Sequence, residues 1–269
     1  MYAFIHIPKT AGSTMRALLR HSFGASHCDL RLPMHKRKPK KWIDAEDFKK
    51  ALRVYRQPAG ICGHRVTPFN QLETVVPDLR YFTILRDPVK RCVSQFLHSH
   101  RSRIDQCTPD DLKSFCADPL ERNVQTRWLC GSEDAVSAIS IIDQKLGFVG
   151  LTERFDESMV MFRAWLGSAD LKDGYKSINL AKGKPSWSIL EDPELAEVVR
   201  EANQADLELY RHAAEHTFAK QVKNYGAGLE ADVVRLREDC QHVTEQKEPV
   251  WAKLKRNYVY KPLIHLRVV

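Results

Sequence analysis

Apolar, strand-forming residues gather in five short stretches of the chain, and each stretch ends at a turn-forming or charged residue. This pattern predicts buried β-strands. Four of the stretches are clear, and the last could be a final short strand. They cover residues 2–7, 58–64, 80–86, 146–152 and 176–179.

Between and after these stretches, apolar residues recur every three or four positions, which predicts amphipathic helices. Asp87-Pro88 is a typical helix opening, with Pro in the first turn. Residues 21–42 are polar and irregular and predict a loop. The helical stretches are 15–20, 44–57, 89–103, an irregular region over 108–144, 155–166, 193–223 and 229–246.

Alternating strands and helices predict an α/β fold, with a central, mostly parallel sheet of about five strands and helices on both faces. The C-terminal part is helical. No repeat or linker divides the chain, so we expect one domain over 1–269, with a core over 1–225 and a helical, basic extension over 226–269. Ligands of such sheets bind at the carboxyl ends of the strands. Lys9, His64 and Arg86 each follow a predicted strand and should line one pocket.

The composition is that of a soluble globular protein, with 43% hydrophobic and 28% charged residues. No apolar run approaches the ~20 residues of a membrane span, and no signal peptide precedes the first strand. We therefore expect a cytoplasmic protein, although a trimmed secretory-pathway enzyme would look the same. Seven cysteines without regular spacing predict a reducing compartment and no structural metal. The net charge of +8 favours anionic ligands.

The chain after the first strand has the chemistry of an anion-binding loop. Pro8 ends the strand, and Lys9 and Gly12 lie in a small-residue turn that leads to a helix N-terminus. Backbone N–H groups, hydroxyls and one ammonium there suit a phosphate or sulfate. The loop is not a Walker A sequence, because Lys9 precedes Gly12. A plain turn with a capping Ser or Thr is the alternative.

A second candidate anion site follows the third clear strand. Arg86 stands at the strand end, and Ser94 lies eight residues later, about two turns into the next helix. A guanidinium fork and a hydroxyl there could grip a phosphate. Taken alone, Arg86 and Asp87 could equally form a structural ion pair. Two anion sites in one sheet suit a nucleotide with phosphates at two places.

Two motifs resemble those of a known family. Residues 8–14, Pro-Lys-Thr-Ala-Gly-Ser-Thr, are similar to the loop that holds the 5′-phosphosulfate in sulfotransferases. Residues 86–94 resemble their 3′-phosphate motif. The nearest subgroup is the heparan sulfate and uronyl 2-O-sulfotransferase-like family, which uses a P-loop-like fold. Further similar stretches are 63–69, 123–131, 149–153 and 202–210.

This resemblance implies 3′-phosphoadenosine 5′-phosphosulfate as the sulfonate donor and no metal. It implies that Lys9 contacts the sulfonate and the bridging oxygen, and that His64 is the general base. The loop residues Thr10, Ala11, Gly12, Ser13 and Thr14 would hold the 5′-phosphate, and Arg86 and Ser94 would hold the 3′-phosphate. Lys184 and Ser186 would lie in a late basic loop near the donor.

Several residues keep more than one interpretation. Turn chemistry explains Lys184 and Ser186 equally well. His6 is expected to be structural, on the packed side of the first strand. His98 and His100 could line the acceptor cleft or face solvent. Arg127 and Trp128 could shape the acceptor side, although a buried helix with a Trp anchor is favoured.

The leading functional prediction is a sulfotransferase that acts on a hydroxyl, expected on a carbohydrate that could itself be anionic. A kinase-like phosphotransferase is disfavoured because the GxxxxGK[ST] pattern is missing. A non-catalytic module that binds polyanions or nucleic acid through the basic run 35–41 and the basic tail from Trp251 is the third class. No nucleic-acid partner is expected. The sequence does not fix the oligomeric state.

Overall fold

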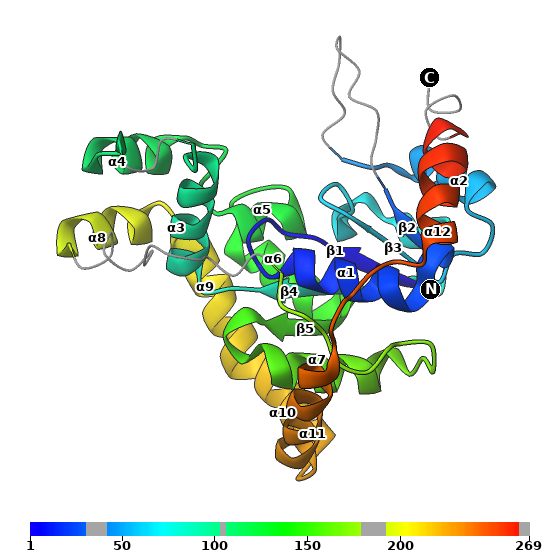
Figure 1. Cartoon of the computed structure of the whole chain (residues 1–269). Helices are drawn as coiled ribbons and strands as arrows, with labels where there is room; N and C mark the ends of the chain where they lie inside the picture. Colours follow the sequence, from blue (N-terminus) through cyan, green and yellow to red (C-terminus); the bar gives the residue numbers. More distant parts are fainter. Residues whose placement is uncertain (31–41, 103–105, 179–191, 264–269) are drawn as a thin grey trace.

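A five-stranded parallel sheet forms the centre of the protein in a computed structural model, which describes residues 1–30, 42–102, 106–178 and 192–263. The strand order is β2-β3-β1-β4-β5 (Figure 1). This arrangement confirms the predicted α/β class. The strands are β1 (Tyr2–Ile5), β2 (His27–Asp29), β3 (Gly60–Gly63), β4 (Arg80–Leu85) and β5 (Leu146–Leu151).

The middle of the sheet is buried on both faces, because helices cover it on either side. Phe4 of β1 pairs in register with Cys62 of β3 and with Phe82 of β4. The rings of Phe4 and Phe82 stack with centroids 4.8 Å apart. Strands buried in this way carry continuous apolar runs, which is why the sequence pattern identified them.

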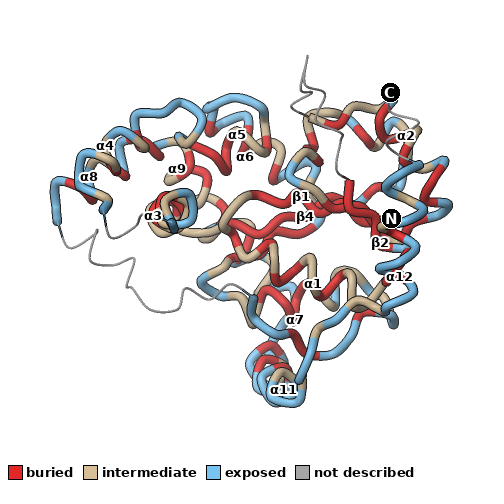
Figure 2. The backbone as a smooth tube through the Cα atoms, turned by 45° about the horizontal axis from the view of Figure 1, so that its top comes forward, coloured by how far each residue is buried: buried red, intermediate tan, exposed pale blue. Residues whose placement is uncertain are grey.

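Helices α1, α7 and α11 lie on one side of the sheet, and α5 and α6 lie on the other (Figure 2). Helices α3, α4 and α8 form a smaller apolar cluster of their own. The helices are α1 (Gly12–Phe23), α2 (Ala45–Val54), α3 (Pro88–Ser99), α4 (Pro109–Ala117), α5 (Val124–Cys130), α6 (Ala135–Lys145), α7 (Phe155–Leu166), α8 (Pro193–Glu201), α9 (Gln204–His212), α10 (Ala219–Tyr225), α11 (Leu229–His242) and α12 (Val250–Lys255). Shorter helical segments are η1 (Gly24–Ser26), η2 (Pro68–Asn70), η3 (Leu72–Thr74), η5 (Thr152–Arg154), η7 (Ala213–Phe218) and η8 (Arg256–Tyr260).

The Asp-Pro opening of α3 is confirmed. Pro88 occupies the first turn, and the Asp87 carboxylate accepts a hydrogen bond from the Lys90 N–H at 2.9 Å. This cap fixes the direction of α3 directly after β4 ends. Arg86 is therefore held between a strand end and a helix start.

Three expectations differ from the structure. The stretch 21–42 contains the edge strand β2, whose three residues are too few to show a periodic pattern. Residues 176–178 do not form a strand. The predicted helix 193–223 breaks after Glu201, because the side-chain oxygen of Asn123, from a remote segment, accepts the N–H groups of Ala205 and Asp206.

No helix in the described part of the chain is long and apolar enough to cross a membrane.

Candidate functional site

The loop between β1 and α1 has an unusual backbone. Lys9 and Ala11 have positive φ angles of 69° and 61°, a conformation that residues other than glycine rarely adopt. Helix α1 then begins at Gly12 without a side-chain cap. Such a helix start directs backbone N–H groups and the positive end of the helix dipole toward one point. The loop therefore has the geometry of an anion site.

Gly12 is required by the close approach of His6. A β-carbon at position 12 would lie 2.0 Å from Cδ2 of the His6 ring. The His6 ring is 5% exposed and stacks between Phe4 and His64, with centroid distances of 5.5 Å and 4.0 Å. Burial, together with the neighbouring His64 and Arg16, lowers the pKa of His6 to about 2, so this imidazole stays neutral at physiological pH. His6 thus separates the loop from His64 as a fixed, uncharged wall.

A cavity of about 300 Å³ opens at the carboxyl ends of β1, β4 and β5. The strands β1 and β4 are parallel neighbours, so the segments that follow them lie at the same edge of the sheet. Both predicted anion sites therefore contribute to this cavity. Segments from distant parts of the chain complete its wall. The lining residues are His6, Lys9, Ala11, Gly12, Ser13, Thr14, Arg86, Ser94, Thr152, Phe155, Tyr175, Ser177 and Ile178.

Arg86 is fixed at the cavity through both its backbone and its side chain. The side chain of Gln125 accepts the Arg86 N–H at 2.9 Å and donates to the Arg86 carbonyl at 2.8 Å. The guanidinium donates from Nη1 to the Lys9 carbonyl at 3.1 Å, which joins the two predicted anion sites. Its Nε is buried without a hydrogen-bond partner among the described residues. A buried, unpaired guanidinium donor is what an anionic ligand would satisfy.

Several cations crowd this cavity. Burial, together with the charges of Arg86 and Arg101, lowers the pKa of Lys9. The charge of Lys9, with burial and Arg101, lowers the pKa of His98. Burial is the larger cause for Lys9, and in both groups neighbouring cations also disfavour the protonated form. A bound phosphate or sulfate would relieve this repulsion.

His64 was expected to line the same pocket as Lys9 and Arg86, but it lies beside this cavity and not in its lining. Its Nδ1 is 2.7 Å from the His6 carbonyl, which can only accept, so Nδ1 donates in this hydrogen bond. The Trp128 indole donates to the His64 carbonyl at 2.9 Å. His64 lines a second cavity of about 230 Å³, in which His6 also takes part. This second cavity further includes Arg16, Asp29, Leu30, Cys62, Gly63 and Arg65.

Two loop residues have structural contacts. Thr10 is fully buried, outside the cavity lining, and its hydroxyl donates to the Ile7 carbonyl at 3.1 Å. The Thr14 hydroxyl accepts the N–H of Ile178 at 3.0 Å, which holds the segment around Ile178 against the loop. The predicted residues Lys184 and Ser186 and the basic run 35–41 lie outside the described residues.

Sequence reasoning missed several lining residues. His6 was expected to be structural; it is indeed buried, but it also faces both cavities. Thr152 follows β5 directly, so the strand-end rule that selected Arg86 could have selected it. Tyr175 and Ile178 carry no such signal, because they reach the cavity only through tertiary packing. His98 is exposed, and His100 contacts the Phe96 carbonyl.

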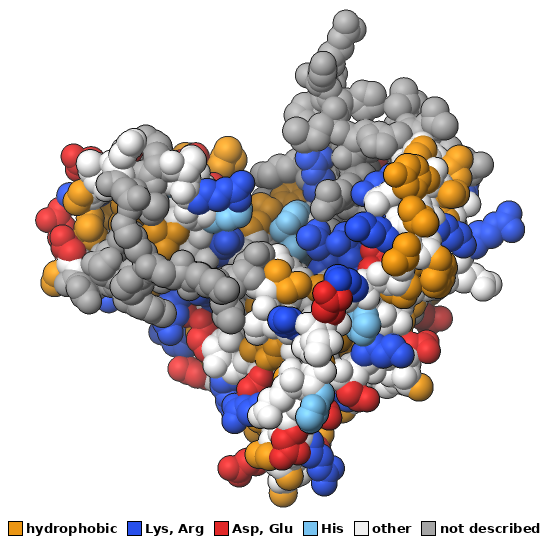
Figure 3. Space-filling view, viewed as in Figure 1, with side chains coloured by type: hydrophobic (Ala, Val, Ile, Leu, Met, Phe, Trp, Pro, Cys, Tyr) orange, Lys and Arg blue, Asp and Glu red, His pale blue; other side chains and the backbone are white. Residues whose placement is uncertain are grey.

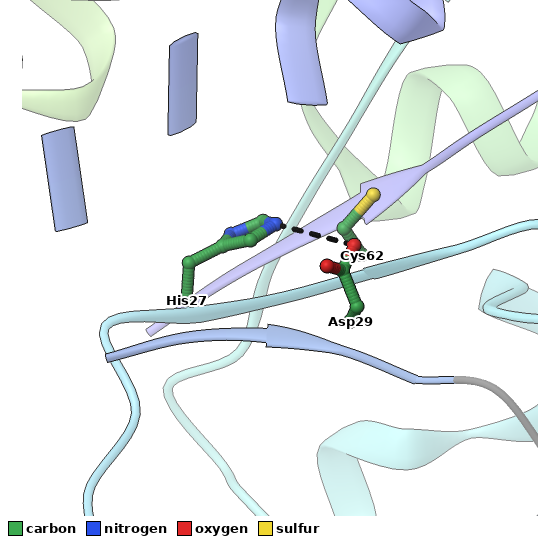
Figure 4. Close-up of side chains that lie close together, drawn as sticks. All are labelled: His27, Asp29 and Cys62. Atoms are coloured by element: carbon green, nitrogen blue, oxygen red, sulfur yellow. Dashed lines mark ion pairs between the residues drawn. The ribbon is translucent and has the colours of Figure 1, made fainter. Parts of the chain in front are cut away.

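His27 and Asp29 of β2 and Cys62 of β3 are potential metal ligands that lie close together (Figure 4). Burial alone would raise the pKa of Asp29, but His27 and Arg20 outweigh it and hold that pKa below its usual range. Arg20 binds Asp29 directly, and Arg256 is 3.7 Å from it. Two guanidinium groups beside the carboxylate disfavour a cation, so this cluster fits a structural ion network better than a metal centre.

No curated protein matches the chain. The model of the sulfotransferase family matches residues 2–213, which include every strand of the sheet and both predicted anion sites. The cavity with its strand-end cations and uncapped helix start lies wholly within the matched region. The chain belongs to the sulfotransferase family.

Proposed function

We propose that this sulfotransferase uses 3′-phosphoadenosine 5′-phosphosulfate as donor and transfers its sulfonate to a hydroxyl of a carbohydrate. The observation that carries the proposal is the single cavity in which the β1–α1 loop and the Arg86–Ser94 pair meet. This cavity offers two anion sites to one ligand. The loop would hold the 5′-phosphosulfate, and Arg86 with Ser94 the 3′-phosphate. The family match also favours sulfotransfer over the phosphotransferase alternative.

Lys9 and His64 would have complementary roles in an in-line displacement. The acceptor oxygen forms a bond to sulfur while the bond from sulfur to the bridging phosphate oxygen breaks. His64 Nε2 would take the proton of the acceptor hydroxyl, because Nδ1 is committed to the His6 carbonyl. Lys9 would stabilise the negative charge that grows on the departing phosphate. The side chains thus supply positioning and charge, and no covalent intermediate is needed.

The acceptor would enter the cavity that His64 lines. Arg16 and Arg65 line the same cavity, so it favours an acceptor that carries a carboxylate or sulfate near the reacting hydroxyl. This preference agrees with the resemblance of several stretches to the uronyl 2-O-sulfotransferase-like subgroup. We therefore propose an anionic sugar as the acceptor class.

The donor site is tested by calorimetric titration with 3′-phosphoadenosine 5′-phosphate. Arg86→Ala should weaken binding by about 10- to 150-fold, the 1.5–3 kcal/mol of a hydrogen bond to a charged group. Arg80→Ala is the matched control, because Arg80 lies at the opposite end of β4 and its side chain contacts Trp165. It removes the same charge and should bind like the wild type. Folded wild-type protein without affinity for the nucleotide would disprove the donor assignment.

The role of His64 is tested by sulfate transfer from labelled donor to a panel of anionic and neutral glycans. His64→Ala should lower kcat by about 100- to 10,000-fold, the usual contribution of a general base. Donor affinity, measured as above, should change little because His64 is not in the donor cavity. Equal rates in the variant and the wild type would remove His64 from the mechanism. A preference for neutral glycans would argue against an anionic acceptor.

A further inference from the structure

The C-terminal helical segment exposes a row of large apolar side chains. Helix α12 and η8 are continuous, and residues 261–263 extend them. Val250, Trp251, Leu254 and Tyr258 are 73%, 61%, 51% and 76% exposed. Trp251, Leu254 and Tyr258 are spaced by three and four residues, which places them on one helical side, and Val250 lies four residues before Leu254 on the same side. We call these four residues the α12 stripe.

The opposite face of this segment is anchored to the protein. Ala252 is fully buried, and Arg256 is 6% exposed. The Arg256 guanidinium forms an ion pair with Glu248 and lies 3.7 Å from Asp29 of β2. Tyr260 packs against Tyr55 with ring centroids 4.1 Å apart. These contacts fix the rotation of the helix, so the α12 stripe faces outward in the folded protein.

Basic side chains accompany the stripe. Lys253, Lys255 and Lys261 are all exposed, and residues 249–263 contain no Asp or Glu. Figure 3 shows the apolar side chains gathered over α12, with Lys and Arg side chains nearby. An apolar helix face with Trp and Tyr, accompanied by lysines, is the composition of a helix that lies in the headgroup region of a membrane.

We propose that the α12 stripe binds the surface of a bilayer rich in anionic lipids, with Trp251 and Tyr258 at the level of the headgroups. Charge decides between this partner and a second copy of the chain. A two-fold symmetric dimer through the stripe would place the lysines of both copies against each other without an acidic partner. An anionic lipid surface attracts the same lysines. This inference concerns where the protein acts and is independent of the donor and acceptor assignments.

The test is co-sedimentation of the protein with vesicles of phosphatidylcholine, with and without one quarter phosphatidylserine. We expect binding only to the vesicles that contain phosphatidylserine. Trp251→Ala with Tyr258→Ala should weaken it at least tenfold. Each Lys→Gln change at 253, 255 or 261 should weaken it by about fivefold. Leu120→Ala with Val136→Ala is the control, because these exposed residues lie elsewhere; it should bind like the wild type.

Three outcomes would overturn the proposal. One is equal binding to both kinds of vesicle or to neither. Another is binding that salt abolishes but the Trp251 and Tyr258 changes leave intact, which would indicate a diffuse electrostatic contact. The third is a concentration-dependent dimer, seen by light scattering, that the same two changes dissociate, or a stable complex with an acidic protein through the stripe. Circular dichroism and thermal unfolding report that each variant is folded.

Discussion

At the scale of single residues, the β1–α1 loop departs from ordinary backbone preferences. Two residues with side chains, Lys9 and Ala11, occupy the left-handed region, which costs on the order of 1–3 kcal/mol each. The conformation persists because neighbouring groups hold it. The Thr10 hydroxyl bonds to the Ile7 carbonyl, and the Thr14 N–H bonds to the Ala11 carbonyl. Strain of this kind at a cavity agrees with a loop shaped for a ligand.

Gly12→Ala should damage this loop through His6. The new methyl group would overlap the His6 ring, whose position is also fixed by Phe4 and His64. Overpacking of this kind costs about 1–3 kcal/mol. We expect a loss of that size in the free energy of unfolding, measured in urea, and weaker nucleotide binding.

The double variant Gly12→Ala with His6→Ala provides the control. Removing the His6 ring makes room for the methyl group, so the cost of Gly12→Ala should be smaller in the His6→Ala background. If the double variant loses as much stability as the two single variants added together, the ring and the glycine do not interact.

At the scale of elements, a buried polar network connects α5, α9 and α3 behind Arg86. The Asp206 carboxylate of α9 accepts the N–H groups of Gln125 and Thr126 at 3.0 and 2.7 Å, at the start of α5. Arg91 of α3 lies 4.0 Å from the same carboxylate. Burial raises the pKa of Asp206, and the charge of Arg91 together with the two amide hydrogen bonds offsets this only in part. Through Gln125, this network determines the position of Arg86.

Asp206→Ala should therefore act on stability and on the donor site together. It removes two hydrogen bonds to a charged acceptor and leaves Arg91 buried without its counter-charge, for which we expect a loss of about 3–5 kcal/mol. Chemical denaturation measures the loss. Asp206→Asn keeps an acceptor at the start of α5 and should lose less. Similar losses in both variants would show that the charge, and not the cap, matters.

At the scale of the whole molecule, topology explains which parts of the site could be predicted. Lys9 and Arg86 follow strands of a parallel sheet, so strand recognition predicted their shared cavity. The same rule also placed His64 there, but His64 lines the neighbouring cavity. Ile178 could not be found in this way, because it reaches the cavity through a hydrogen bond to Thr14, 164 residues away. The strand β2 was missed because it is short and because His27 and Asp29 are polar. Their burial depends on hydrogen bonds to Tyr2 and Arg20, which no local pattern indicates.

Because the cavity joins these distant segments, a ligand bound there should stabilise the protein as a whole. At 100 times its dissociation constant, 3′-phosphoadenosine 5′-phosphate would add about 2.7 kcal/mol to the free energy of unfolding. For a chain of this size we expect Tm to rise by roughly 5–10 °C in calorimetry. At the same nucleotide concentration, Arg86→Ala should lose about half of this rise or more, and Arg80→Ala should keep it. A rise in Tm of equal size in both variants would show that the nucleotide binds away from Arg86 and outside the cavity that Arg86 lines.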